Sequence, residues 1–231
     1  MKKIIVIVLI GLITIACGKD SENTMIVQGT IKDLKKGTLY LQKQNDSLMV
    51  TVDSVALDGT DTYILKAEVE SPEMYYLSLD KSPSKEIAFF GEKGTITINT
   101  KLDKFQFAAK INGLTNQQLL DEYNKIKSKY TGKRLDLVKA DFEAKRDNDT
   151  IRIDSIANAI DQLLKSRYRY AINFAITNRD KEVAPFVALT EFNDANLVWI
   201  DSVNNSLTPE IKESKYGKIL NEFVAERKKS N

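Results

Sequence analysis

Apolar and polar residues alternate in the segment Thr62-Tyr63-Ile64-Leu65-Lys66-Ala67-Glu68-Val69. A period of two is typical of a strand with one face buried and the other in water. The same alternation occurs upstream in Leu48, Val50 and Val52. Asp58-Gly59 lies between the two runs and predicts a turn in which Gly59 takes a positive φ without a Cβ clash.

Similar short runs continue on both sides of this pair, and turn signals separate them, among them Gly37 and Gly94, which we also expect at positive φ. The further predicted strands cover residues 25–31, 38–43, 74–79, 86–90, 95–99 and 105–111. About eight short strands at this spacing favour a small antiparallel β-sandwich or barrel.

The pattern changes to a helical period after Gly113. Thr115 and Gln118 form a predicted capping box, with Thr115 as N-cap, and Asp149 is the predicted N-cap of a second long helix. Shorter helices are expected from Pro185 through Phe192, after Asp194 or Asn196, and from Thr208-Pro209 to the Lys-rich end. Strands followed by helices predict an α+β fold or two adjoining domains, with a β-rich part at 25–114 and a helical part at 115–231.

Composition excludes several kinds of chemistry. The chain has 34 Lys and Arg against 32 Asp and Glu, one Cys and no His. Without His there is no Ser-His-Asp system and no His-ligated metal, and one Cys allows neither an internal disulfide nor a CxxC pair. We expect no cofactor, no metal and no enzymatic activity.

The N-terminus has the features of an export signal. Met1-Lys2-Lys3 precedes the apolar run 4–16, which is too short to span a bilayer. Cys17 follows directly, in Thr14-Ile15-Ala16-Cys17-Gly18, and the sequence resembles a bacterial lipobox in which Cys17 is lipidated. An ordinary cleaved signal with a chance Cys is the alternative. Residues 17–24 are then the lipidated Cys and a polar tether, in which 19–22 either resembles a surface-export signal or is a plain linker.

Removal of residues 1–16 takes away Lys2 and Lys3 and leaves basic and acidic residues equal in number. A neutral mature protein does not favour nucleic acid as a partner. We expect the protein to contact the membrane through its N-terminal lipid, as an outer membrane lipoprotein that faces the periplasm or the cell surface.

The strand region resembles a known family in several motifs. They are Gly29-Thr30-Ile31-Lys32-Asp33-Leu34, Gly37-Thr38-Leu39-Tyr40-Leu41, Asp53-Ser54-Val55-Ala56-Leu57-Asp58-Gly59, Val69-Glu70-Ser71-Pro72, Phe90-Gly91-Glu92-Lys93-Gly94-Thr95-Ile96-Thr97-Ile98 and Ile111-Asn112-Gly113. Together they are similar to domain of unknown function 4369 of Bacteroidetes-type lipoproteins, over roughly residues 25–116. In many such proteins a thioredoxin-like domain follows the helical segment, but this sequence stops at Asn231 without a CxxC. The resemblance implies a location and a fold and carries over no catalytic residue.

Asp-Ser or Asp-Thr followed by an aliphatic residue recurs five times and is similar to the O-glycosylation signal of exported Bacteroidetes proteins. The hydroxyl residues concerned are Ser47, Ser54, Thr150, Ser155 and Ser202. Such pairs are also common at turns and helix caps.

Other clusters have structural explanations that we prefer. Asp147-Asn148-Asp149 lacks the remaining ligands of a calcium loop and predicts a turn between helices. Tyr168-Arg169-Tyr170 and Trp199 are expected to pack in the helical core rather than stack on bases or bind a ligand. Nothing in the sequence brings together the carboxylates Asp121, Glu122 and Asp201 as an acid–base pair.

These observations lead to one functional hypothesis and one alternative. The hypothesis is a lipid-anchored, non-enzymatic binding or scaffold module for another envelope protein. The alternative is an accessory subunit of a thioredoxin-like redox system, in which a separate chain supplies the CxxC.

Overall fold

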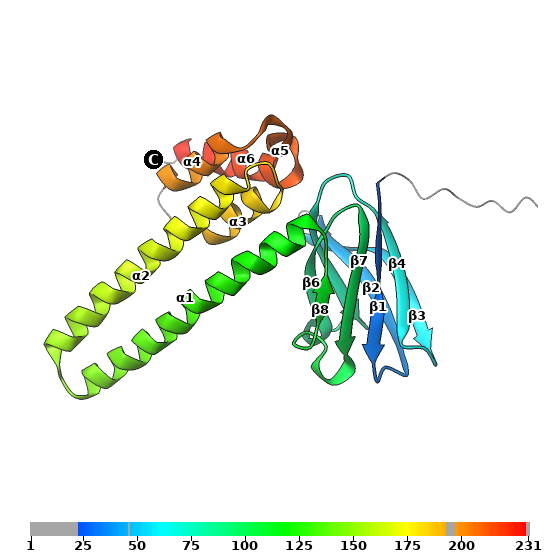
Figure 1. Ribbon diagram of the computed structural model, residues 1–231, viewed down its shortest axis with the longest axis horizontal. Coiled ribbons are helices and arrows are strands. Elements are labelled where there is room, and N and C mark those ends of the chain that lie inside the picture. Colours follow the sequence, from blue (N-terminus) through cyan, green and yellow to red (C-terminus); the bar gives the residue numbers. More distant parts are fainter. Residues whose placement is uncertain (1–22, 46, 193–196, 230–231) are drawn as a thin grey trace, which may run out of the picture.

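The computed structural model describes residues 23–45, 47–192 and 197–229. Eight strands come first, β1 (Thr24–Lys32), β2 (Lys36–Asn45), β3 (Leu48–Asp58), β4 (Thr62–Glu68), β5 (Glu73–Leu79), β6 (Glu86–Gly91), β7 (Gly94–Lys101) and β8 (Lys110–Asn112). Six α-helices follow, α1 (Thr115–Arg146), α2 (Thr150–Thr177), α3 (Val183–Glu191), α4 (Leu197–Ser206), α5 (Pro209–Glu213) and α6 (Lys215–Lys229). Strands lie on one side of the molecule and helices on the other, which confirms the α+β fold (Figure 1).

The strands form two four-stranded sheets in the orders β4-β1-β7-β8 and β3-β2-β5-β6. The sheets remain separate and pack face to face, so the sandwich of the two predicted alternatives is the observed one. Period-two alternation places Val27, Leu65 and Ile96 of one sheet and Leu41 and Leu77 of the other in a shared buried core. Removing these apolar faces from water drives the two sheets together.

The expectation of a purely antiparallel sandwich is wrong at one position, because β1 and β7 pair in parallel. Parallel neighbours need a long crossover connection, and here the chain passes through the whole second sheet between β1 and β7. Local sequence contains no signal for this pairing.

Glycine at the turns behaves largely as expected. Gly59 and Gly94 have positive φ values of 77° and 122°, but Gly37 lies inside β2 and is not among the residues with positive φ. Gly59 does not close a hairpin within one sheet, since β3 and β4 belong to different sheets. The turn therefore carries the chain from one layer of the sandwich to the other.

The predicted strand at 105–111 is wrong in most of its length. A 3-10 turn at Leu102–Lys104 reverses the chain, Phe105 is buried, and only Lys110–Asn112 pairs with β7. The Thr100 hydroxyl donates to the Phe105 carbonyl at 2.6 Å, which holds the segment in a compact loop. The apolar residues of this segment suggested a strand, whereas the Phe105 side chain packs into the sandwich core from a loop.

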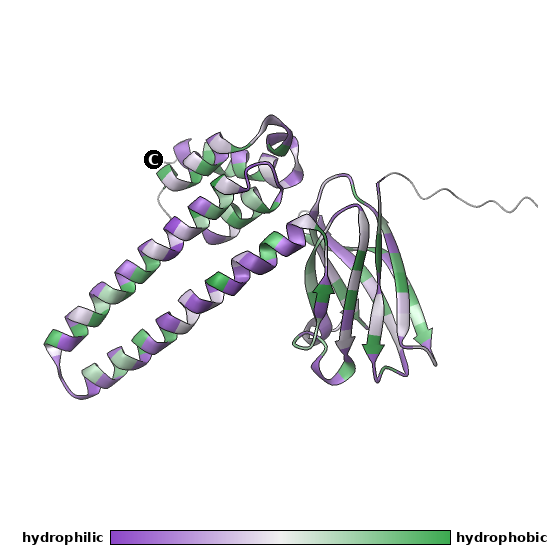
Figure 2. Ribbon diagram, in the orientation of Figure 1, coloured by the Kyte–Doolittle hydropathy of each residue, from purple (hydrophilic) through white to green (hydrophobic). Residues whose placement is uncertain are grey.

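The strands end at Asn112 and the first helix begins at Thr115, where the period of the sequence changes. α1 and α2 form a long antiparallel hairpin, and α3 to α6 pack as a compact group against the C-terminal half of α2 (Figure 1). Figure 2 shows apolar residues interspersed with polar ones along the whole hairpin. No helix in the described ranges has the length and hydropathy that a membrane span requires.

Helix starts follow the sequence only in part. Asp149 caps α2 by accepting from the Arg152 amide at 3.0 Å, and the Thr208 hydroxyl accepts from Ile211 at the start of α5. The helix predicted from Thr208-Pro209 to the C-terminal end is interrupted at Ser214 and continues as α6. The helix predicted to start at Pro185 is α3, which starts two residues earlier, at Val183. The alternative caps Asp194 and Asn196 lie outside the described residues.

Candidate functional site

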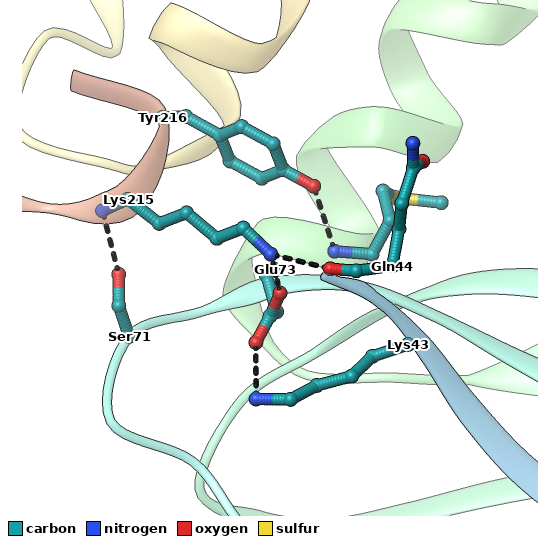
Figure 3. A network of polar contacts seen from close by, with 7 residues as sticks. Lys43, Gln44, Ser71, Glu73, Lys215 and Tyr216 are labelled. Carbon is teal, nitrogen blue, oxygen red and sulfur yellow. Dashed lines mark hydrogen bonds and ion pairs between the residues drawn. The ribbon is translucent and has the colours of Figure 1, made fainter. Parts of the chain in front are cut away.

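The junction between the sandwich and the helices contains a buried carboxylate held by two lysines. Glu73 of β5 accepts from Lys43 of β2 at 2.9 Å and from Lys215 at the start of α6, whose ammonium also donates to the Gln44 carbonyl at 2.8 Å (Figure 3). Two cations compensate the cost of burying the carboxylate. These groups are engaged with one another, so we interpret the cluster as a clamp between the sandwich and the helices.

A shallow cleft adjoins this clamp. Its volume is about 270 Å³, and Tyr216 is one of its lining residues. The Tyr216 phenolic oxygen accepts a hydrogen bond from the Met74 backbone amide at 3.0 Å, which holds the ring in place. Burial raises the pKa of Tyr216, so this phenol stays neutral. The cleft is lined by Gln44, Asn45, Met74, Tyr76, Phe186, Lys215, Tyr216 and Ile219.

The predicted capping box at the start of α1 is wrong. Thr115 is the first residue of α1, and the N-cap, Leu114, makes no side-chain bond to the helix. Glu92, in the turn after β6, instead accepts a hydrogen bond from the Asn116 backbone amide at 2.8 Å. It thereby provides a carboxylate at the positive end of the helix. The side-chain amide of Gln118 donates to the Gly113 backbone carbonyl at 3.1 Å.

Asn116 and Gln117 join three elements at this point. Gln117 accepts from the Phe90 amide of β6 at 2.6 Å, and Asn116 accepts from the Val183 amide at 3.0 Å. The Asn116 side chain donates to both Glu92 and Glu182 at 3.1 Å. These bonds fix where α1 leaves the sandwich and thereby set the direction of the hairpin.

Residues 124–170, named the arm here, form most of the hairpin. They contact the folded body at their base, at Lys127 and from Arg167 onward, and project from it beyond that base (Figure 1). Ala144 and Ile156 are its only buried residues. Three large apolar side chains on one face of α1, Leu135, Val138 and Phe142, are 65%, 48% and 71% exposed. Their spacing of three and four residues makes a continuous ridge on the helix.

A groove of about 590 Å³ runs between α1 and α2 of the arm, and Leu135 and Val138 of the ridge belong to its lining. Its walls are largely apolar, and Arg134 and Arg167 are its charged members. The full lining is Tyr130, Thr131, Arg134, Leu135, Val138, Ile160, Leu163, Leu164 and Arg167. The ridge and the groove together form an apolar surface that no other described residue covers.

The base of the arm is held by a second buried carboxylate. Glu191 of α3, only 2% exposed at its side chain, lies 2.6 Å from the Lys127 ammonium of α1 and 3.6 Å from Nε of Arg167 of α2. Burial, and then the charge of Glu191, raise the pKa of the neighbouring Tyr123 phenol. This cluster fixes both helices of the arm to α3.

The sites expected from the sequence lie apart from these features. Cys17 lies outside the described residues. The five candidate glycosylation positions are all exposed: Ser47 in the turn before β3, Ser54 in β3, Thr150 and Ser155 at the tip of the arm, and Ser202 in α4. Solvent exposure satisfies the steric requirement for modification and leaves modification itself a prediction.

The clusters with preferred structural explanations are part of the framework. Asp147-Asn148-Asp149 forms the α1–α2 turn, and no group of three metal-ligating side chains occurs among the residues described. Tyr168 packs on Phe192 and Trp199, and Tyr170 stacks on Tyr123. These are contacts within the helical core, as predicted.

The candidate carboxylates are held by separate partners. Asp121 accepts from the Gln117 side chain at 2.7 Å, and its burial raises its pKa, whereas Asp201 pairs with Lys228 at 2.8 Å. Asp121 lies on α1 and Asp201 on α4, with different neighbours, so the structure does not assemble them into an acid–base pair.

The geometry defines an α+β protein with a β-sandwich, a helical body and a projecting two-helix arm. Residues 25–120 match the family model described as Domain of unknown function (DUF4369). The match begins at the second residue of β1 and continues through β8 to the first residues of α1, while the arm lies beyond it. Searches of curated proteins and of solved structures found no match to the chain.

The arm was not predicted as a surface from the sequence. The signal was present in Leu135, Val138 and Phe142, but the same spacing also marks a helix face that packs into a core. Only the position of α1 outside the body distinguishes the two cases.

Proposed function

We propose that this protein is a non-enzymatic, lipid-anchored binding module of the cell envelope, and that the arm is the part that contacts its partner. The exposed Leu135–Val138–Phe142 ridge carries the proposal. Large contiguous apolar surfaces are uncommon on monomeric proteins and mark interaction sites. The clamp at Glu73 and the cluster at Glu191 support the same function, because they hold the arm in a defined direction.

The anchoring part of the proposal rests on the sequence before the described residues. The basic start, the apolar run 4–16 and Cys17 support export followed by attachment of lipid to Cys17. Several acyl chains give effectively permanent membrane binding, since each buried methylene contributes about 0.8 kcal/mol. An anchored protein whose binding surface projects from its body suits a scaffold for another envelope component.

The arm is tested by site-specific photo-crosslinking in intact envelopes. A photoreactive amino acid at position 142 should give a discrete adduct with another protein. The same group at position 107, where Phe107 of the sandwich is 90% exposed, is the control and should not give that adduct. Equal products from both positions, or none from position 142, would contradict the arm as a binding surface.

The anchor is tested separately with Cys17→Ala. We expect this change to abolish labelling by a fatty-acid analogue and to leave unprocessed precursor, because the thiol that receives the lipid is gone. Metabolic labelling followed by gel analysis measures both effects. Normal labelling of the variant would refute lipidation at Cys17.

A further inference from the structure

The arm resembles a helical bundle from which one helix is missing. Between residues 124 and 170 only Ala144 and Ile156 are buried, so α1 and α2 hide little apolar surface against each other. Helices in folded proteins gain most of their stability from packing an apolar face against other elements. A third helix laid between α1 and α2 would bury the faces that they leave open.

The open surface has dimensions suited to a helix. From Tyr130 to Phe142 it follows α1 for about 18 Å at 1.5 Å per residue, or roughly three turns. Val138 and Leu164 line the groove from opposite helices, and the exposed Phe142 extends the apolar surface beyond it. An acyl chain lying in the groove would leave Phe142 uncovered, whereas a helix over the groove and the ridge would cover it.

Charge specifies the occupant further. Residues 125–169 contain twelve Lys and Arg against seven Asp and Glu, a net charge of +5, within a mature chain that is neutral overall. Six of these cations have no ion pair with any described residue, namely Lys125, Lys129, Lys133, Arg134, Lys139 and Arg169. Arg134 lies in the groove itself.

This charge decides between the possible occupants. Pairing with the arm of a second copy would bring two surfaces of +5 together, which electrostatic repulsion disfavours. A flat anionic membrane would contact the protruding ridge but would leave the groove between the two helices unfilled. A helix with acidic flanks avoids the first problem and suits a groove whose charged lining residues, Arg134 and Arg167, are both cationic.

We infer that the arm binds an acidic amphipathic helix of a partner protein, which completes a three-helix bundle with α1 and α2. This inference rests on the proposed function and adds the chemical class of the partner. Apolar residues of the incoming helix enter the groove between Val138 and Leu164, and its flanking carboxylates meet Arg134 and Arg167.

The test uses two dye-labelled synthetic peptides of about 21 residues, three heptads, with Leu at the a and d positions. One peptide has Glu at e and g, the other has Lys there, and both have Ala and Gln elsewhere. Fluorescence anisotropy is measured against the protein starting at Gly18, which retains every residue of the described fold. We expect binding of the Glu peptide at least about tenfold tighter than of the Lys peptide, and weaker as salt is added.

Variants locate the binding. Arg134→Glu and Val138→Ser should each weaken the Glu peptide at least about fivefold, because they remove a cation and an apolar contact of the groove. Phe107→Ser, on the sandwich, is the matched control and should leave binding unchanged. Arg134 and Val138 are both exposed, and circular dichroism of each variant verifies that it is folded.

Several results would overturn the inference. These are no binding of the Glu peptide, equal binding of both peptides, binding of phosphatidylglycerol vesicles in place of the peptide, or a dimer of the protein that Val138→Ser dissolves. The crosslinking experiment at position 142 distinguishes failure of the acidic-helix inference from failure of the proposed binding function. An adduct there without Glu-peptide binding would retain the binding module and reject the acidic helix.

Discussion

Glu92 and Glu182 share the side-chain amide of Asn116, so two carboxylates meet at one donor in the domain junction. Burial raises the pKa of Glu182, and the charge of Glu92 adds to this, while the hydrogen bond from Asn116 opposes it. A carboxyl group whose pKa is raised by folding favours the folded state when it is protonated. Its contribution is therefore present at low pH and is lost as pH rises through the raised pKa.

Glu182→Gln is the corresponding residue-scale prediction. The amide keeps an oxygen that accepts from Asn116 and removes the buried charge, so we expect a higher Tm than the parent protein at about pH 7. The gain should shrink as pH falls toward about 4, because the parent carboxyl then becomes protonated.

Thermal unfolding between these two pH values measures the effect. Glu68→Gln on the exposed side of β4 is the control and should show no comparable gain. A Tm increase that stays constant with pH, or a lower Tm at neutral pH, would contradict the prediction that the buried charge of Glu182 destabilises the folded protein.

At the scale of elements, the arm is stabilised at its two ends rather than along its length. Lys127 and Arg167 fix its base to Glu191, and Asp149 caps α2 at its tip. Between these points the helices are held by few buried side chains. We therefore expect the tip to depend strongly on its cap.

Asp149→Ala should weaken the tip of the arm. The change removes the acceptor for the Arg152 amide and should cost about 1 kcal/mol in the helix that it caps. Amide hydrogen exchange should accelerate in the first turns of α2 and at the end of α1, with the sandwich unaffected. Asp149→Asn retains a capping oxygen and should behave nearly as the parent protein; equal acceleration in both variants would argue against the cap.

At the scale of the whole molecule, β6 contributes side chains both to the sandwich core and to the helical core. Phe89 points into the sandwich and stacks on Tyr75 at 6.1 Å, while the next residue, Phe90, is buried among the helices. Phe90 meets Phe186 edge-on at 5.6 Å and Tyr216 at 6.0 Å. Alternation along one strand thus couples the sandwich to the helical body.

Phe90→Ala should uncouple the two parts. The loss of a buried Phe costs about 3–5 kcal/mol, and here it falls on the contact between cores. We expect unfolding to split into two transitions, with the helical body unfolding first, as followed by calorimetry and by circular dichroism at helix and aromatic wavelengths. Phe89→Ala should instead destabilise the sandwich, and a single coincident transition in Phe90→Ala would contradict this coupling.

Much of the architecture was available from local patterns. The alternation in 62–69, the Asp58-Gly59 turn and the change of period after Gly113 predicted strands, a turn and the start of the helices, because side-chain periodicity and turn chemistry act over a few residues. The Asp149 and Thr208 caps followed for the same reason. The segment 105–111 failed because an apolar run does not distinguish a strand from a loop whose Phe105 fills the core.

Contacts between distant residues decided the rest. The parallel pairing of β1 with β7, the Glu92 carboxylate at the start of α1 and the place of Phe90 in the helical core join positions that are far apart in the chain, so no local pattern encodes them. The candidate site belongs to this second group. The spacing of Leu135, Val138 and Phe142 determined an apolar helix face by itself, but only the tertiary structure left that face uncovered, because the bonds at Asn116 and Gln117 direct α1 away from the body.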